Sequence, residues 1–153
     1  MKSFEVENMG KRLSRRTYMA IEEIKKKVEK YWEAFNNGDL DGQLALMSEN
    51  ATFTTIGSTP MSDCKIGKNE IRKHFKKFNE LIEPGAVMNI RRLIAENDIV
   101  ACLSEGNMFG RIGKIYNNQY VFIFQFANDE IIKITEYLDT ELIETSLFGK
   151  SLN

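Results

Sequence analysis

The sequence predicts an α+β fold in which helices come first and one large curved sheet, mixed or antiparallel, follows. Two observations predict it. Apolar residues recur at helical spacing between Thr17 and Phe35, and four segments nearer the C-terminus alternate or run apolar with turn residues between them. Helices laid on such a sheet bury its apolar face. We therefore expect a cone-shaped sheet wrapped around a long N-terminal helix, with a blind pocket at its open end.

The helical segments are recognised by their apolar spacing and by the residues at their ends. Gly38 suits the end of the long helix, and Asp39 can cap a short second helix that carries Leu40, Leu44 and Met47. After a short strand at 51–57, a third helix is expected over 69–82. The apolar face of the long helix consists of Ile21, Ile24, Val28, Tyr31, Trp32 and Phe35.

Four long strands and a last helix complete the predicted elements. The strands are expected over 86–95, 98–109, 115–127 and 130–139, and the turns between them are short enough to require antiparallel neighbours. An amphipathic segment over 140–148 predicts a short helix with Thr140 as its N-cap. Residues 1–16 show no period and are expected to form a flexible arm, whereas residues 17–150 are expected to form a single domain.

Composition argues against several classes of function. The formal net charge is −1, which lacks the basic excess that nucleic-acid binding normally needs. Cys64 and Cys102 do not have metal-ligand spacing, and His74 is the only histidine, so we expect no metal site and no cofactor. No apolar run approaches the ~20 residues of a membrane helix. We expect a cytoplasmic protein without a membrane partner.

Two stretches of sequence resemble a known family. "YWEAFNNGDLDGQLALMSENATF" and "YVFIFQFANDEIIKITEYLD" look like the SnoaL-like branch of the nuclear transport factor 2-like superfamily, which is related to steroid delta-isomerases and limonene-epoxide hydrolases. The resemblance covers about residues 20–148 and implies a cystatin-like roll that forms a homodimer through its sheet. This superfamily includes isomerases, cyclases, hydrolases and binding modules without activity, so the resemblance alone does not choose between them.

The resemblance also implies roles for individual residues. Tyr31 falls where steroid isomerases keep a hydrogen-bonding tyrosine, but Thr55 and Phe122 stand where their two acids should be. Delta-isomerase activity is therefore disfavoured. Glu136 and Glu105 match the two acids of the epoxide hydrolases. There, however, Leu103 replaces the arginine between the acids, and Phe53 and Thr55 replace the tyrosine and asparagine that orient water.

Strand periodicity independently draws attention to the same two acids. The last strand has a row Ile132, Ile134, Glu136, Leu138, and an earlier strand has a row Ile99, Ala101, Leu103, Glu105. If both rows face the interior, two carboxyl groups share an apolar cavity, and one can act as general acid and the other as general base. Alternatively, either acid lies at the rim or in a dimer contact. Arg92, which interrupts the row Met88, Ile90, Ile94, is a candidate basic partner, or it could equally replace the missing arginine between the acids.

Other residues are candidates for the pocket wall or for packing alone. Tyr31 is either a core residue with a satisfied hydroxyl or a catalytic donor, and His74 is expected to be structural. Gln119, Val121, Ile123 and Gln125 form the outer row of one strand and suit a homodimer contact. The expected ligand-binding residues are Trp32, Phe35, Phe53, Thr55, Arg92, Leu103, Phe122, Phe124, Ile134 and Leu138.

The sequence thus predicts a homodimer that binds a small, mainly apolar molecule. Acid/base chemistry by Glu136 with Glu105, assisted by Tyr31, would make it an isomerase, cyclase or hydrolase. The alternative is a ligand-binding or interaction module of the same fold without activity. Polyketide, terpene and steroid ligands are not separated by the sequence.

Overall fold

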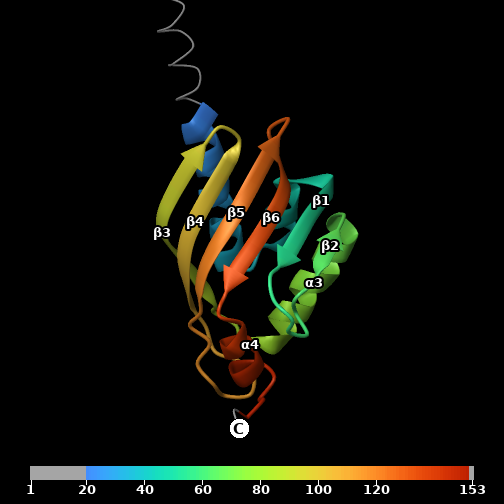
Figure 1. Ribbon diagram of the computed structural model, residues 1–153, viewed down its shortest axis with the longest axis vertical. Helices are drawn as coiled ribbons and strands as arrows, with labels where there is room; N and C mark the ends of the chain where they lie inside the picture. The colour runs from blue at the N-terminus through green and yellow to red at the C-terminus, as the bar shows by residue number, and fades with distance from the viewer. Residues whose placement is uncertain (1–19, 152–153) are drawn as a thin grey trace, which may run out of the picture.

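The computed structural model describes residues 20–151 and shows one curved six-stranded sheet with helices against it (Figure 1). The strand order is β2-β1-β6-β5-β4-β3. β1 and β6 are parallel, whereas the other neighbours are antiparallel. The α+β class predicted from the sequence is confirmed, and the sheet, which was predicted to be mixed or antiparallel, is mixed. The strands are β1 (Met47–Thr55), β2 (Cys64–Ile66), β3 (Val87–Glu96), β4 (Ile99–Asn107), β5 (Gln119–Ala127) and β6 (Glu130–Leu138).

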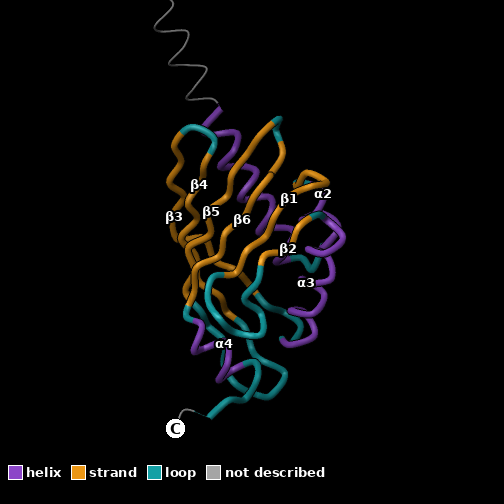
Figure 2. Tube along the Cα trace, turned by 45° about the vertical axis from the view of Figure 1, so that its right-hand side comes forward, coloured by secondary structure: helices purple, strands orange, loops and turns teal. Residues whose placement is uncertain are grey.

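The helices pack mainly on one face of this sheet, as Figures 1 and 2 show from two directions. The first helix is helical over 20–36 within the described residues, and its Tyr31 and Trp32 pack against Phe124 and Phe122 of β5. The other helices are α2 (Leu40–Ala45), α3 (Lys68–Leu81) and α4 (Thr140–Ser146). Within residues 20–151, none of the helices has the length and apolar character needed to cross a membrane. The predicted arm, residues 1–16, lies outside the described residues.

Helix and strand ends differ from the sequence prediction at a few residues. Asp39 caps α2 as expected, because its carboxylate accepts a hydrogen bond from the Gly42 N–H. Met47, however, begins β1 instead of extending α2. The N-cap of α4 is Asp139 and not Thr140, since the Asp139 carboxylate accepts from two backbone N–H groups of the first turn. The three-residue strand β2 was not predicted because it is too short to show a period.

Two bulges change which side chains face the helices. In β6 the pairing with β5 shifts by one residue at Ile132, so that Ile131 is buried and Ile132 only half-buried. In β3 the pairing with β4 shifts at Arg91, which turns the following residues over. Each bulge inserts one residue, and one residue is enough to exchange the two faces of a strand.

The row of β4 that faces the helices is the opposite of the predicted one. Val100, Cys102, Ser104 and Gly106 are buried, whereas the predicted row from Ile99 to Glu105 lies on the outer face. Gly106 faces inward where larger side chains leave little space. A Cβ on Gly106 would approach Met108 and Tyr120 to 3.1 and 3.4 Å.

Candidate functional site

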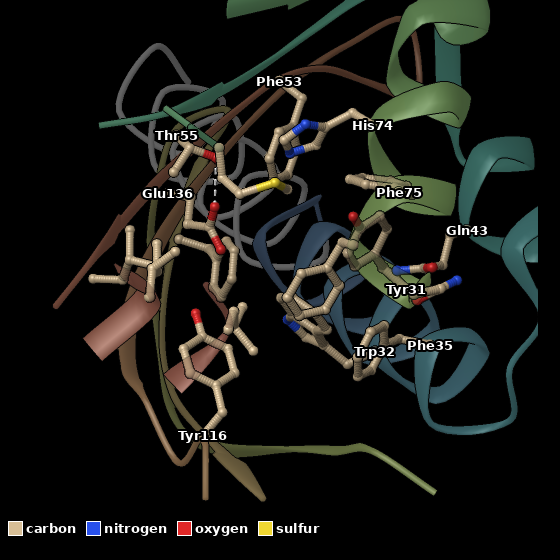
Figure 3. Close-up of a pocket in the computed structure, with 17 residues that line it drawn as sticks. Tyr31, Trp32, Phe35, Gln43, Phe53, Thr55, His74, Phe75, Tyr116 and Glu136 are labelled. Atoms are coloured by element: carbon tan, nitrogen blue, oxygen red, sulfur yellow. Dashed lines mark hydrogen bonds between the residues drawn. The ribbon is translucent and has the colours of Figure 1, made fainter. Parts of the chain in front are cut away.

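A cavity of about 60 Å³ lies between the sheet and the helices (Figure 3). The first helix, α2, α3 and α4 contribute to its wall together with β1, β5, β6 and two loops. Most of the lining is apolar or aromatic. The lining residues are Tyr31, Trp32, Phe35, Gln43, Phe53, Thr55, Met61, His74, Phe75, Phe78, Asn79, Tyr116, Phe122, Glu136, Leu138, Ile143 and Leu147.

Glu136 provides the carboxyl group of the cavity, and the register of the sheet gives it a partner. β1 and β6 run parallel with Thr55 opposite Glu136. The Thr55 hydroxyl donates a hydrogen bond to Glu136 Oε2 at 2.7 Å. Burial raises the pKa of Glu136 to about 7, and the hydrogen bond from Thr55 only partly opposes this rise. Near neutral pH the carboxyl can therefore both accept and donate a proton.

Two buried tyrosines of the cavity wall lie near this carboxyl. Tyr31 comes from the first helix and is 2% exposed, and Tyr116 comes from the loop between β4 and β5 and is 1% exposed. Burial, and the nearby charge of Glu136, raise the pKa of both phenols far above the ordinary value. Both hydroxyl groups are therefore protonated donors at any physiological pH. Among the lining residues in Figure 3, only Thr55 and Glu136 are joined by a hydrogen bond between side chains.

His74 also belongs to the cavity wall, although the sequence indicated only a structural role. It is buried on α3, and its ring lies 5.4 Å from the ring of Phe53. Burial is the main cause that lowers the pKa of His74 to about 4, with Lys65 and Lys77 adding to the effect. At neutral pH the imidazole is uncharged, so it does not supply a positive charge to the cavity.

The structure brings several predicted residues together in this wall. Glu136 and Tyr31 both line the cavity. Phe124 and Ile134 do not; they are buried in the core, where Phe124 packs edge-on against Tyr31. The expected ligand-binding residues that line the cavity are Trp32, Phe35, Phe53, Thr55, Phe122 and Leu138.

The interior placement of Glu105, Leu103 and Arg92 is wrong. Glu105 and Leu103 lie on the outer row of β4, and Glu105 pairs there with Arg91, whose Nε is 3.0 Å from Glu105 Oε2. Arg92 is exposed because the bulge at Arg91 turns it outward. The cavity therefore contains one carboxyl group and not two, and no arginine lines its wall.

About half of the wall was not predicted as a binding surface. His74, Phe75 and Phe78 lie on the apolar stripe of α3, a signal that the sequence does contain, and Ile143 lies on the apolar face of α4. Met61 and Tyr116 come from loops, where periodicity gives no signal. The remaining members of this unpredicted set are Gln43, Asn79 and Leu147.

A second hollow adjoins the cavity on the outside. This groove has a volume of about 360 Å³ and lies between the end of the first helix and the turn after α3. Phe35 and Asn79 line both the groove and the cavity. An engineered cavity of roughly 150 Å³ holds a benzene ring, so a ring-sized ligand requires movement of half-buried side chains such as Phe35.

A metal centre is not formed by this part of the chain. Within residues 20–151, no group of three or more His, Cys, Asp or Glu side chains is placed to hold a metal ion. Cys64 is exposed and Cys102 is buried, and both are free thiols. Burial raises the pKa of the Cys102 thiol to about 11, which leaves it a poor nucleophile at neutral pH.

Solved structures with the same arrangement of elements are numerous. A nuclear transport factor 2-like protein of unknown function from Burkholderia pseudomallei matches with a TM-score of 0.76 and 17% identity, covering 82% of this chain and 97% of the other. Bal32a, from a soil-derived mobile gene cassette, matches with a TM-score of 0.74 and 22% identity, covering 85% and 98%. TerC, co-crystallised with polyporic acid, matches with a TM-score of 0.73 and 15% identity, covering 82% and 97%. At these identities the likeness shows the fold alone.

Sequence comparison gives the family. No curated protein matches the chain. The SnoaL-like domain profile matches residues 28–136, a range that includes most of the cavity wall and ends at Glu136. This match covers more than half of the chain and agrees with the shared fold. The chain therefore belongs to the SnoaL-like domain family, and it has the fold of nuclear transport factor 2-like proteins.

Proposed function

We propose that the protein binds a small, mainly apolar molecule in the cavity and that Glu136 moves a proton on it. The observation that carries the proposal is a single carboxyl group with a pKa of about 7 in a wall of aromatic side chains. A general base works best when its pKa lies near the working pH. TerC, which has the same fold and was co-crystallised with polyporic acid, supports ligand binding in this fold.

The chemistry follows from having one acid and not two. Ionised Glu136 takes a proton from a carbon atom of the ligand, and the protonated carboxyl then returns that proton to another carbon atom. This is the proton transfer of an isomerase. In a cyclase the carbanion instead attacks a carbonyl carbon of the same ligand, the C=O π pair moves to the oxygen, and that oxygen takes the proton back from Glu136. Epoxide hydrolysis by a pair of acids is disfavoured because Glu105 lies on the outer face. In this scheme Tyr31 is a hydrogen-bond donor to the ligand.

Nitroethane provides a direct test because it is a small, neutral carbon acid whose ionisation needs only a base. We expect the protein to accelerate deuterium incorporation at its α carbon in D₂O, measured by NMR. The rate should rise with pH through about 7, as Glu136 loses its proton. In the Glu136→Gln variant the exchange rate should fall to the rate without protein, since the amide cannot accept the proton.

Glu105→Gln is the matched control for this experiment. It makes the same chemical change on the outer face of β4, outside the cavity, and should leave the exchange rate unchanged. Exchange that persists in Glu136→Gln, or that is lost equally in Glu105→Gln, contradicts the proposal.

A second candidate function is ligand binding without catalysis. It is favoured by the small cavity and by the loss of the expected acid pair, since Glu136 has no second carboxyl within the wall. This function would be selected if nitroethane binds to the wild-type protein but exchanges the hydrogen of its α carbon only at the background rate.

A further inference from the structure

The inference starts from the hairpin of residues 108–116, which connects β4 to β5 and lies with α4 at one end of the molecule (Figure 1). Four large apolar side chains of this end are open to water. Single exposed apolar side chains are common, but a group of them marks a surface of contact. The group, called the apolar tip below, consists of Phe109 (52% exposed), Ile112 (49%), Ile115 (59%) and Phe148 (38%).

Backbone hydrogen bonds hold the hairpin in this position. Phe109 and Ile115 are paired across it, and the Gly110 N–H closes its turn by donating to the Lys114 carbonyl at 2.8 Å. The Glu83 N–H donates to the Phe109 carbonyl at 2.8 Å and so ties the hairpin to the residues after α3. Because the backbone is held on both sides, the apolar side chains stay exposed unless a partner covers them.

Apolar side chains lie on both sides of the hairpin. A Cβ on Gly110 would clash with α4, so residue 110 faces that helix. Side chains alternate along a strand, so Phe109 and its partner Ile115 face away from α4. Ile112, at the turn, instead lies within contact distance of Gly149, in the segment after α4. A flat protein partner covers one side of a hairpin, whereas a lipid layer surrounds an inserted hairpin on all sides.

The charges at this end favour a negatively charged surface. The hairpin and the segment 147–151 contain three basic residues and no aspartate or glutamate. Arg111 lies 3.7 Å from Glu83, and Lys150 pairs with Glu144, so acids balance two of the three charges. The third, Lys114, donates to a backbone carbonyl and forms no ion pair with the acids of the described residues.

We propose that the apolar tip inserts into the surface of an anionic lipid bilayer, with the Lys114 ammonium near the lipid phosphate groups. A long basic side chain suits this position, because it reaches the head groups while its apolar neighbours are inserted. The expectation of no membrane partner rested on the lack of a spanning segment, which docking on a surface does not need. The proposal goes beyond the proposed function, since it requires neither Glu136 nor a ligand.

Docking through this end brings the interior cavity close to the lipid. Tyr116 of the hairpin lines the cavity, and so does Leu147, which directly precedes Phe148 of the apolar tip. An apolar molecule that is concentrated in the bilayer then has a short path to the aromatic wall of the cavity.

Co-sedimentation with vesicles tests the proposal. We expect the wild-type protein to bind vesicles of equal parts phosphatidylcholine and phosphatidylglycerol, and to bind phosphatidylcholine vesicles more weakly. Ile112→Ser should weaken binding about tenfold, because it removes the apolar side chain at the turn. Ile66→Ser is the matched control: Ile66 is 67% exposed on the edge strand β2, and its replacement should leave binding unchanged.

Charge gives an independent measurement. Lys114→Gln should weaken binding to the anionic vesicles about fivefold, the value for one basic residue near such a surface, and should leave binding to phosphatidylcholine unchanged. Lys30→Gln makes the same change on the exposed face of the first helix and should have no effect. Added salt should weaken binding to the anionic vesicles only.

Tryptophan emission reports insertion directly. Phe109→Trp keeps an aromatic side chain in the apolar tip, and its emission should shift to shorter wavelength when anionic vesicles are added. Ile66→Trp should show no shift. Trp32 is 4% exposed and contributes the same background to both variants.

Three outcomes overturn the proposal. The first is a wild-type protein that does not bind the anionic vesicles, and the second is an equal loss of binding in Ile112→Ser and Ile66→Ser. The third is an emission of Phe109→Trp that vesicles leave unchanged. If Ile112→Ser instead converts a dimer to a monomer in light scattering without vesicles, the apolar tip is a contact between protein copies and the proposal is wrong.

Discussion

At the scale of the residue, Glu136 shows how position sets chemistry. It lies in the same strand as Glu130, which is exposed, but its side chain reaches the cavity. Desolvation disfavours its charged form, and one hydroxyl group, that of Thr55, supports that form. A single neutral hydrogen bond does not replace the hydration of a carboxylate, so the pKa stays raised.

The raised pKa of Glu136 predicts a pH-dependent stability. Between pH 4.5 and about 7 the folded protein binds the Glu136 proton more tightly than the unfolded chain does. The free energy of unfolding therefore falls as pH rises through this range and remains lower above it. Glu136→Gln lacks this effect, so its stability relative to wild type should increase by on the order of 3 kcal/mol between pH 4.5 and pH 8.

Urea unfolding at several pH values measures this difference, and other ionisable groups cancel between variant and wild type. A difference that is constant with pH would mean that Glu136 titrates alike in the folded and unfolded states. It would also remove the main support for acid/base chemistry.

At the scale of the element, the existence of every strand except the three-residue β2 was predictable from sequence, but the facing of strands was predictable only in part. The row Tyr120, Phe122, Phe124 and Phe126 of β5 is buried. This facing was predictable because the opposite row begins and ends in glutamine. β4 has apolar residues on both rows, so its period could not reveal that Glu105 faces outward. In β3 and β6 the bulges change the facing within the strand, and no residue at those positions marks them.

The candidate site was predictable to a similar extent and for similar reasons. Tyr31 and Glu136 were found because a polar residue within an apolar row stands out in a helix or strand. Tyr116 was missed because its position depends on a loop, and its hydroxyl direction depends on the distant backbone of Asp139. Contacts between residues far apart in sequence leave no periodic signal.

The bulge in β6 can be checked by two adjacent substitutions. Ile131 is 0% exposed, whereas Ile132 is half-buried. Ile131→Ala should lower the free energy of unfolding by about 2–5 kcal/mol because it leaves a cavity in the core, and Ile132→Ala should cost clearly less. Urea unfolding gives both values. The reverse order would indicate that the last strand is regular, as its sequence suggests.

At the scale of the whole molecule, the outer face of the sheet has an apolar centre. Val121 of β5 is 36% exposed, and it lies between Leu103 of β4 and Tyr137 of β6, which is 48% exposed. Ile123 follows on the same face of β5 and is the diagonal neighbour of both. The Arg91–Glu105 ion pair lies beside this group. Isolated proteins seldom leave a contiguous apolar area open to water. The homodimer through the sheet that the sequence predicts stays a prediction, and this face is where it would form.

A charge at the centre of this face provides the test. Val121→Lys should convert a dimer to a monomer in size-exclusion chromatography with light scattering, because an unpaired buried ammonium is costly. Asn50→Lys places the same charge on an exposed residue of β1 and should leave the mass unchanged. A wild-type protein that is monomeric at micromolar concentration contradicts the prediction.

Asp139 connects the end of the chain to the interior. Its carboxylate begins α4, its backbone holds Asn118, and α4 supplies Ile143 to the cavity wall. Asn118 in turn contacts Tyr116 Oη at 3.4 Å, so the position of the last helix and that of the Tyr116 hydroxyl are coupled. If α4 and Asp139 move to admit a ligand, Asn118 loses its two hydrogen bonds to the Asp139 backbone, and the position of Asn118 beside Tyr116 Oη is no longer fixed. Both contacts would return when α4 returns to the position seen here.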